Sequence, residues 1–205
     1  MRELSDATVM AIIRGRDADA AVASALVLFD EGIRFVEVAL TTPSALEVVA
    51  RVRAKAGPQV RLGAGTVLTA EDVDAALAAG ADFVVTPAVA PSVRAAADRG
   101  VPCAAGALTP TEAWAAMAAG AAVVKLFPAS LGGPAYLKAL RDPFPAVPFM
   151  AVGGVGIDAA PGYLAAGAVA VGVGGPLVAD AASGGDLDAL RARARRYAAL
   201  SGAAS

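Results

Sequence analysis

The sequence predicts an α/β fold, a single TIM-barrel domain of the (β/α)8 type that occupies residues 1–205. The first observation is a repeated sequence pattern, in which an alanine-rich helical run ends in glycine and a short apolar run follows. It occurs around Gly32, Gly80, Gly100, Gly120 and Gly167. Glycine just past a helix end takes the left-handed conformation at low cost. Short apolar runs are typical of parallel strands buried on both faces, and eight such units fit the minimum size of this barrel.

The predicted strands follow one another at intervals that leave room for a helix between them. In chain order they are residues 9–14, 35–40, 60–64, 83–86, 102–105, 122–127, 148–152 and 169–173. Capping chemistry marks several helix starts: Thr109 followed by Pro110 and Glu112, Thr69 with Asp72, and the pair Thr42-Pro43. An open, doubly wound sheet is the alternative. The barrel is preferred because eight strands are many for an open sheet and no nucleotide-binding fingerprint follows the first strand.

Composition and charge exclude several classes of protein. Hydrophobic residues make up 57% of the chain and charged residues 18%, which argues against disorder. The net charge is −2 and no basic tract occurs, so no nucleic-acid partner is expected. Residues 159–179 carry no charge over a length that could span a bilayer, but glycines and prolines interrupt them, so no membrane helix is expected. The cluster Arg191, Arg193, Arg195 and Arg196 near the C-terminus is explained by a solvated helix face at least as well as by a phosphate site.

The chain contains no histidine, which narrows the chemistry that it could perform. Zinc sites built on histidine and nucleophiles paired with histidine are excluded. Proton transfer therefore falls to carboxyl, amine or phenol groups or to water. The single cysteine, Cys103, is predicted to be a small core residue. Without a disulfide or an apolar leader at the N-terminus, the expected location is the cytoplasm.

Lys125 stands in the apolar run Ala-Ala-Val-Val-Lys-Leu-Phe-Pro, although the chain has only three lysines against fourteen arginines. Desolvation favours the neutral form of an amine, and a neutral amine attacks ketones and aldehydes to form a Schiff base. The alternative is a lysine at a strand end whose head group reaches water. The residues alone leave both interpretations open.

Glu37 is a second ionisable group inside an apolar strand. Taken alone, it would be interpreted as a buried partner that neutralises Lys125 or Arg14. When Glu37 is considered together with Lys125, a role in proton transfer is favoured more than it is for Glu37 alone. Schiff-base chemistry needs a group that transfers protons, and histidine is absent.

Other candidates lie where predicted strands end, since working residues of a barrel gather at the C-terminal ends of its strands. Gly63-Ala64-Gly65-Thr66 could hold a carboxylate through backbone N–H groups and a hydroxyl. The pairs Gly153-Gly154 and Gly174-Gly175 end the last two strands, where barrels often bind phosphate. Tight turns are the structural alternative. Asp82 is expected at the opposite rim in a structural role, and Trp114 and Tyr163 are expected to pack.

Together these segments resemble a known family, the class I aldolases that cleave 2-keto-3-deoxy-6-phosphogluconate, its galactonate epimer and 4-hydroxy-2-oxoglutarate. The matching segments are Val36-Glu37-Val38, Gly63-Ala64-Gly65-Thr66-Val67, Thr86-Pro87, Val124-Lys125-Leu126-Phe127-Pro128-Ala129 and Val152-Gly153-Gly154-Val155. The resemblance implies a homotrimer of small barrels with no metal and no cofactor beyond a covalent imine. The implied ligands are a phosphorylated 2-keto-3-deoxy sugar acid and pyruvate.

The resemblance also implies a role for each matching residue. Lys125 would form the Schiff base and Glu37 would act as general acid and base. Thr66 would bind the pyruvate carboxylate, and Pro87 and Phe127 would wall the site. The phosphate would be bound by the loops that contain Gly153, Gly154, Gly174 and Gly175.

Three positions bear on the substrate. Many phosphogluconate-type members have arginine where this chain has Thr41, and Arg14 could supply that charge, as in galactonate-type members. Many members have serine where this chain has Gly175, so the phosphate would be bound by backbone N–H groups. Val152 and residues 133–140 resemble the galactonate type. A threonine hydroxyl in place of Val152 could bond the C4 hydroxyl of one epimer, and valine cannot.

Two other functions remain as alternatives. A phosphosugar isomerase, epimerase or synthase could use the same phosphate loops and would form no covalent pyruvate adduct. A non-catalytic sugar-phosphate binding barrel would contain Lys125 and Glu37 as a buried ion pair. Neither explains why an amine and a carboxylate meet at the catalytic end of the barrel.

Overall fold

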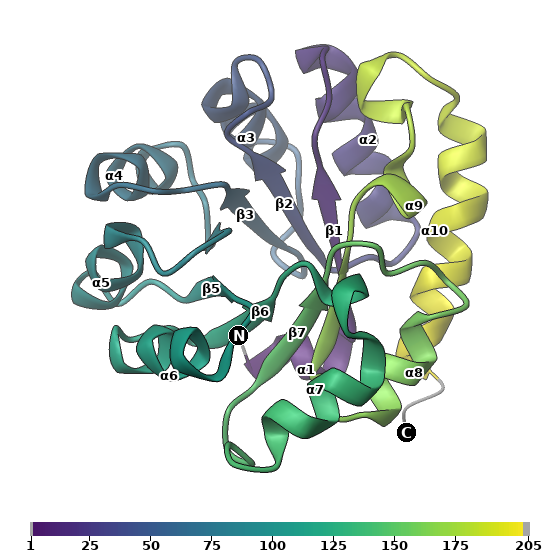
Figure 1. Cartoon of the computed structure of the whole chain (residues 1–205). Helices are drawn as coiled ribbons and strands as arrows, with labels where there is room; N and C mark the ends of the chain where they lie inside the picture. The colour runs from purple at the N-terminus through teal and green to yellow at the C-terminus, as the bar shows by residue number, and fades with distance from the viewer. Residues whose placement is uncertain (1, 203–205) are drawn as a thin grey trace.

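The structure is a computed structural model that describes residues 2–202. Eight parallel strands close into a barrel in sequence order, and β8 pairs with β1, so the open-sheet alternative is wrong (Figure 1). All eight predicted strands are confirmed to within two residues at each end. Their bounds are β1 (Val9–Ile13), β2 (Phe35–Ala39), β3 (Arg61–Gly65), β4 (Phe83–Thr86), β5 (Cys103–Ala107), β6 (Val123–Leu126), β7 (Phe149–Val152) and β8 (Ala170–Val173).

Helices surround the barrel and connect its strands (Figure 1). They are α1 (Arg2–Ala7), α2 (Ala18–Asp30), α3 (Ala45–Arg53), α4 (Ala70–Ala78), α5 (Pro91–Asp98), α6 (Pro110–Ala118), α7 (Gly133–Arg141), α8 (Ala160–Ala165), α9 (Gly175–Val178) and α10 (Leu187–Gly202), with short 3-10 turns η1 (Ala129–Leu131) and η2 (Ala181–Ser183). None of these helices is long and apolar enough to cross a membrane.

The local signals at the helix ends are mostly confirmed. Thr69 and Thr109 each form a capping box with the acidic residue three positions later. The glycines that end helices in the repeated sequence pattern are confirmed in the left-handed conformation. Their φ angles lie between +69° and +99°, for Gly32, Gly80, Gly100, Gly120 and Gly167. The expectation for Thr42-Pro43 is wrong, because α3 begins after Ser44, whose φ is +52° and whose side chain makes no capping bond. The chain enters α3 through the left-handed backbone conformation of Ser44 and not through a side-chain cap.

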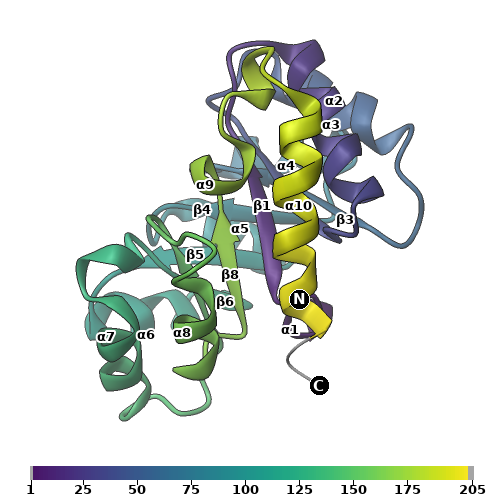
Figure 2. The same cartoon turned by 90° about the vertical axis from the view of Figure 1, so that its right-hand side faces the viewer.

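Apolar side chains fill the lower part of the barrel interior. Phe35 and Phe83 meet there with ring centroids 5.8 Å apart, and Leu4 of α1 covers them from the N-terminal end. Figure 2 shows α1 beside the end of α10. The Ser201 hydroxyl joins these two segments by donating to the Ala7 carbonyl. The N-terminal end of the barrel interior is therefore closed by apolar side chains.

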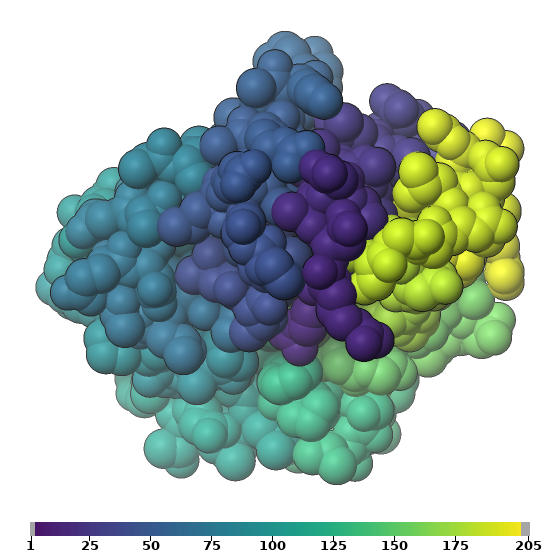
Figure 3. All heavy atoms as spheres, turned by 90° about the horizontal axis from the view of Figure 1, so that it is seen from above, coloured from purple at the N-terminus to yellow at the C-terminus, as the bar shows by residue number. Residues whose placement is uncertain are grey.

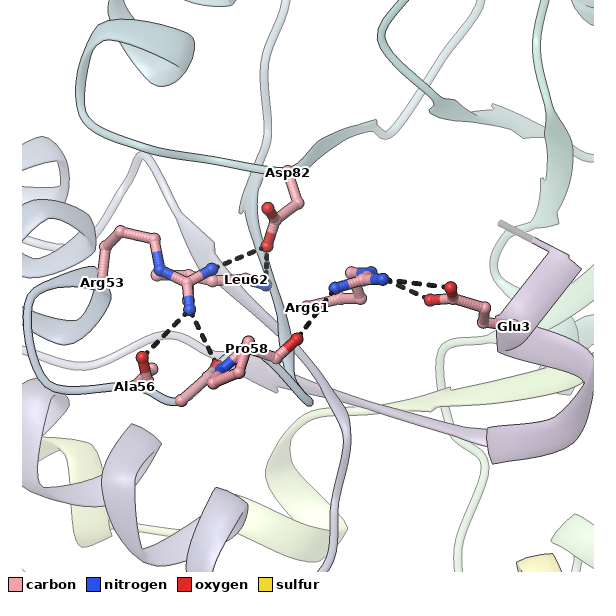
Figure 4. A network of polar contacts seen from close by, with 8 residues as sticks. Glu3, Arg53, Ala56, Pro58, Arg61, Leu62 and Asp82 are labelled. Atoms are coloured by element: carbon pink, nitrogen blue, oxygen red, sulfur yellow. Dashed lines mark hydrogen bonds and ion pairs between the residues drawn. The ribbon is translucent and has the colours of Figure 1, made fainter.

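The N-terminal rim is held by polar contacts (Figure 4). Asp82 accepts bonds from the Leu62 backbone N–H at 2.8 Å and from the Arg53 guanidinium at 3.0 Å, and Arg61 pairs with Glu3. The predicted structural role of Asp82 is therefore confirmed. This rim contributes stability, while the chemistry lies at the other end.

Three side chains were predicted to pack inside the protein, and two of these predictions are confirmed. Tyr163 is buried and donates its hydroxyl to the Ala129 carbonyl at 3.0 Å, and Cys103 is a buried core residue. Trp114 is 65% exposed and stacks only against Phe144, with ring centroids 6.3 Å apart, so its predicted packing role is wrong. It lies on the outward face of α6.

Candidate active site

A cavity of about 440 Å³ opens at the C-terminal ends of the strands. Every residue predicted for the site lines this cavity except Glu37, which is buried and does not line it. The predicted residues that line it are Arg14, Thr66, Pro87, Lys125, Phe127, Val152, Gly153, Gly154, Gly174 and Gly175. Closure of the barrel thus brings together segments from six of its strands and the loops that follow them.

Lys125 projects from β6 into the barrel, at the register of Gly106 on β5 and Met150 on β7. The residue is only 6% exposed, and its Nζ lies 5.3 Å from the centre of the Phe127 ring. The ring face favours a cationic or partly cationic amine and shields it from water. This places the amine at the base of the cavity, within reach of a bound ketone.

Glu37 projects from β2 at the register of Ile12 and Gly63 and is 2% exposed. Its Oε2 makes no hydrogen bond within residues 2–202, and no ion pair joins it to Lys125 there. Burial raises the pKa of Glu37, while the charges of Lys125 and Arg14 act in the opposite direction. A carboxyl group in this environment can hold a proton and release it as the charge nearby changes.

Gly65 and Thr66 shape the site around Glu37. A Cβ added to Gly65 would lie 2.8 Å from Oε1 of Glu37, so only glycine leaves room for that carboxyl group. Thr66 follows with φ +61°. This conformation costs a residue other than glycine about 1–3 kcal/mol and typically persists where function requires it. Thr66 lines the cavity in this conformation, at the start of the β3–α4 loop.

Pro87 and Phe127 both form parts of the cavity wall. The Pro87 backbone passes so close to β5 that a Cβ on Gly106 would lie 2.0 Å from the Pro87 carbonyl oxygen. Gly106 therefore allows the β4–α5 loop to fold inward.

The loop after β7 is fixed against the loop after β6. Gly153 and Gly154 have φ of +93° and +74°, and a Cβ on Gly154 would lie 2.6 Å from the Ser130 Cβ. The Ser130 backbone N–H donates to the Gly153 carbonyl. In contrast, a Cβ on Gly175 would meet nothing within 4 Å. The two glycine pairs thus differ, because only the second has space for a side chain.

Some lining residues were not predicted from the sequence. Ile12, Val155 and Pro176 are apolar, and apolar residues give no functional signal. Ala179 also lines the cavity, with φ 49° and ψ −125°, a conformation that alanine seldom adopts and that no sequence pattern indicates. Thr86, a polar residue at the end of β4, does not line the cavity, since it alternates with the inward-facing Val85.

Comparison with known proteins agrees with this geometry. The profile of the family described as "KDPG and KHG aldolase" matches residues 1–192. The chain belongs to this family. It is 36% identical over 171 residues to the 2-dehydro-3-deoxy-6-phosphogalactonate aldolase of Escherichia coli K12, covering 82% of this chain and 83% of the relative. It is 41% identical over 159 residues to the 2-dehydro-3-deoxy-phosphogluconate aldolase of Treponema pallidum, covering 77% and 75%.

A solved structure of a family member is also similar. The KDPG aldolase of Legionella pneumophila, with pyruvate captured as a covalent carbinolamine, superposes with a TM-score of 0.80 at 27% identity, covering 98% of this chain and 96% of that one. The chain is accordingly an enzyme of the aldolase class, a carbon–carbon lyase. Within the described residues, no three His, Cys, Asp or Glu side chains group in a way that could hold a metal ion.

Proposed function

We propose that the chain is a class I aldolase that cleaves 2-dehydro-3-deoxy-6-phosphogalactonate, 2-dehydro-3-deoxy-6-phosphogluconate or both to pyruvate and glyceraldehyde 3-phosphate. Cleavage of 4-hydroxy-2-oxoglutarate to pyruvate and glyoxylate would be a further activity of the same site. One observation carries the proposal: the largely buried Lys125 lines the cavity, and Glu37, whose Oε2 makes no hydrogen bond within residues 2–202, is buried close enough to Lys125 for the two charges to interact.

In the first half of the reaction, the Lys125 amine attacks the C2 ketone and forms a carbinolamine. Glu37 donates the proton that lets the C2 hydroxyl leave as water, and an iminium remains. Because Glu37 is buried and does not line the cavity, a water molecule would carry protons between its carboxyl group and the substrate. The carbinolamine captured in the Legionella pneumophila enzyme is the same type of intermediate.

In the second half, the iminium accepts the electron pair of the C3–C4 bond. Glu37, now a carboxylate, takes the C4 hydroxyl proton through water, and the aldehyde fragment leaves. The enamine on Lys125 then takes a proton at C3, and water hydrolyses the resulting iminium to pyruvate and the free amine. The Phe127 ring, 5.3 Å from the amine, favours its cationic forms along this path.

The substrate carboxylate would lie against Thr66 and the N–H groups of its loop, and the phosphate against the loops after β7 and β8. Val152 lines the cavity between these two ends. Without a hydroxyl at this position, the site lacks the hydrogen bond that would select the phosphogluconate configuration at C4. We therefore infer a preference for the galactonate epimer.

A homotrimer is the proposed assembly. Large apolar side chains remain on the surface of the protomer, with Trp114 65% and Leu131 71% exposed. Burial of such side chains between copies would remove apolar surface from water. Light scattering on the wild type and on the pair Trp114→Glu and Leu131→Glu tests this proposal: a trimer that dissociates in either variant supports it, and a monomeric wild type contradicts it.

The function is tested by turnover. Pyruvate release from both phosphorylated epimers and from 4-hydroxy-2-oxoglutarate is followed with lactate dehydrogenase and NADH. Wild type should release pyruvate, and Lys125→Ala should release almost none, whereas Lys138→Ala, which removes an exposed lysine of α7, should match wild type. Substantial turnover by Lys125→Ala would refute the Schiff-base assignment.

A further inference from the structure

A second cavity adjoins the first at the catalytic end of the barrel. It has a volume of about 480 Å³ and shares Arg14, Thr41 and Ala179 with the first cavity. Its other lining residues are Gly15, Arg16, Asp180 and Ser183. We refer to it as the annex. None of the residues that line only the annex belongs to the predicted site.

The annex is built where two segments far apart in the sequence meet. A Cβ on Gly15 would lie 1.8 Å from the Ala182 carbonyl oxygen, so the β1–α2 loop lies directly on η2. The Arg16 backbone N–H donates to the Ser183 hydroxyl at 3.1 Å. Figure 3 shows the dark purple beginning of the chain beside the yellow-green segment before α10. These contacts fix the backbone from which Arg16 extends.

Arg14 and Arg16 are exposed and make no ion pair within residues 2–202, unlike many other arginines of the chain. Those that are paired with carboxylates are Arg51, Arg53, Arg61, Arg94, Arg99, Arg191 and Arg195. Arg14 and Arg16 both belong to the β1–α2 loop, which borders the first cavity through Arg14.

Asp17 and Asp19, the acidic residues nearest to Arg16 in the chain, are engaged elsewhere, whereas Asp180 lines the annex with Arg16 and makes no ion pair within residues 2–202. Asp17 caps α2 by accepting from the Ala20 N–H, and Asp19 pairs with Arg51. The Asp180 carboxyl group lies against Gly185, where a Cβ would come within 2.3 Å of Oδ1. Arg16 is thus left as a guanidinium without a carboxylate partner, beside an open cavity.

We infer that Arg16 determines specificity for the anionic far end of the substrate, an inference that rests on the proposed function. The glycine pairs 153–154 and 174–175 bring no charged or hydroxyl side chain to the phosphate. Arg14 lines the same cavity as those loops, and Arg16 lines the annex that adjoins it; neither makes an ion pair within residues 2–202. Guanidinium groups bind phosphate through paired hydrogen bonds. Arg16 accordingly supplies charge that the loops lack, while Lys125 holds the pyruvyl end.

The test is aldol addition of pyruvate to two aldehydes, glyceraldehyde 3-phosphate and glyceraldehyde, which differ only in the phosphate. For Arg16→Gln the KM for glyceraldehyde 3-phosphate should rise about tenfold, since a charge-assisted hydrogen bond is worth about 1.5 kcal/mol or more. The constants for glyceraldehyde should not change. Arg16→Lys, which keeps the charge, should retain part of the discrimination.

Arg34→Gln is the matched control, because Arg34 is an exposed arginine that precedes β2 at the opposite end of the barrel. It should behave as wild type with both aldehydes. Equal effects of Arg16→Gln on the two aldehydes, or no effect on either, would overturn the inference. A reducible pyruvate adduct on wild type and on Arg16→Gln separates this result from failure of the proposed function. If wild type forms no adduct, both proposals fail.

Discussion

Gly65→Ala tests whether the position of the Glu37 carboxyl group controls turnover. The new Cβ would lie 2.8 Å from Oε1 of Glu37, and ordinary contact begins at 3.4 Å, so the carboxyl group would have to move by about 0.6 Å. It has little room to do so, since Glu37 is buried. A misplacement of about 1 Å at a reacting group can cost about 100-fold in rate, so we expect kcat to fall roughly 10- to 100-fold.

The same substitution is also expected to lower the free energy of unfolding. Overpacking costs about 1–3 kcal/mol, and replacement of a strand glycine returns about 0.5–1 kcal/mol. We therefore expect a net loss of up to about 2.5 kcal/mol in the free energy of unfolding, measured with urea. The kinetic assay is pyruvate release coupled to lactate dehydrogenase.

Gly57→Ala is the control for Gly65→Ala, because a Cβ on Gly57 would meet nothing within 4 Å. It should leave both kcat and stability close to wild type. The reducible pyruvate adduct should survive in Gly65→Ala, since Lys125 is not displaced. A folded Gly65→Ala protein with wild-type kcat would refute the reasoning that turnover depends on the position of the Glu37 carboxyl group.

Other substitutions address the same site. Glu37→Gln should lower kcat at least about 100-fold with pyruvate binding retained, and loss of pyruvate binding would indicate a structural role instead. Burial raises the pKa of Glu37, so the native state holds this proton more tightly than the unfolded chain does. Stability of wild type relative to Glu37→Gln should therefore fall as the pH rises through that raised pKa; urea unfolding at several pH values measures this, and a constant difference would contradict it. Gly175→Ser places a hydroxyl in open space and should lower the KM for phosphorylated substrate about fivefold, whereas an unchanged KM would argue against phosphate at this loop.

Local sequence signals predicted the strands well. Five of the eight, β2, β4, β5, β6 and β8, follow a glycine whose left-handed conformation ends the preceding helix. Local signals did not predict α1, whose six residues depend on Leu4 reaching the barrel interior. Nor did they predict the turn at Ser44, where φ is positive without a glycine. Such features depend on tertiary contacts rather than on local propensity.

For the site, the sequence indicated which residues meet but not how deep each one lies. Lys125 and Glu37 could be recognised as ionisable groups in apolar strands, but the space for the Glu37 carboxyl group depends on Gly65 across the β2–β3 pair. The annex could not be predicted, because it requires Arg16 to lie beside Ser183, and no pattern links residues so far apart in the chain. Trp114 was misjudged because helical spacing alone does not say which face of α6 turns outward.

The most direct test of the account is the intact mass of the protein after treatment with pyruvate and borohydride. Wild type should carry one reduced pyruvate adduct, and Lys125→Ala should carry none, because the imine can form only on that amine. A folded wild-type protein without an adduct, or an adduct that persists in Lys125→Ala, would contradict the central claim that Lys125 is the Schiff-base nucleophile.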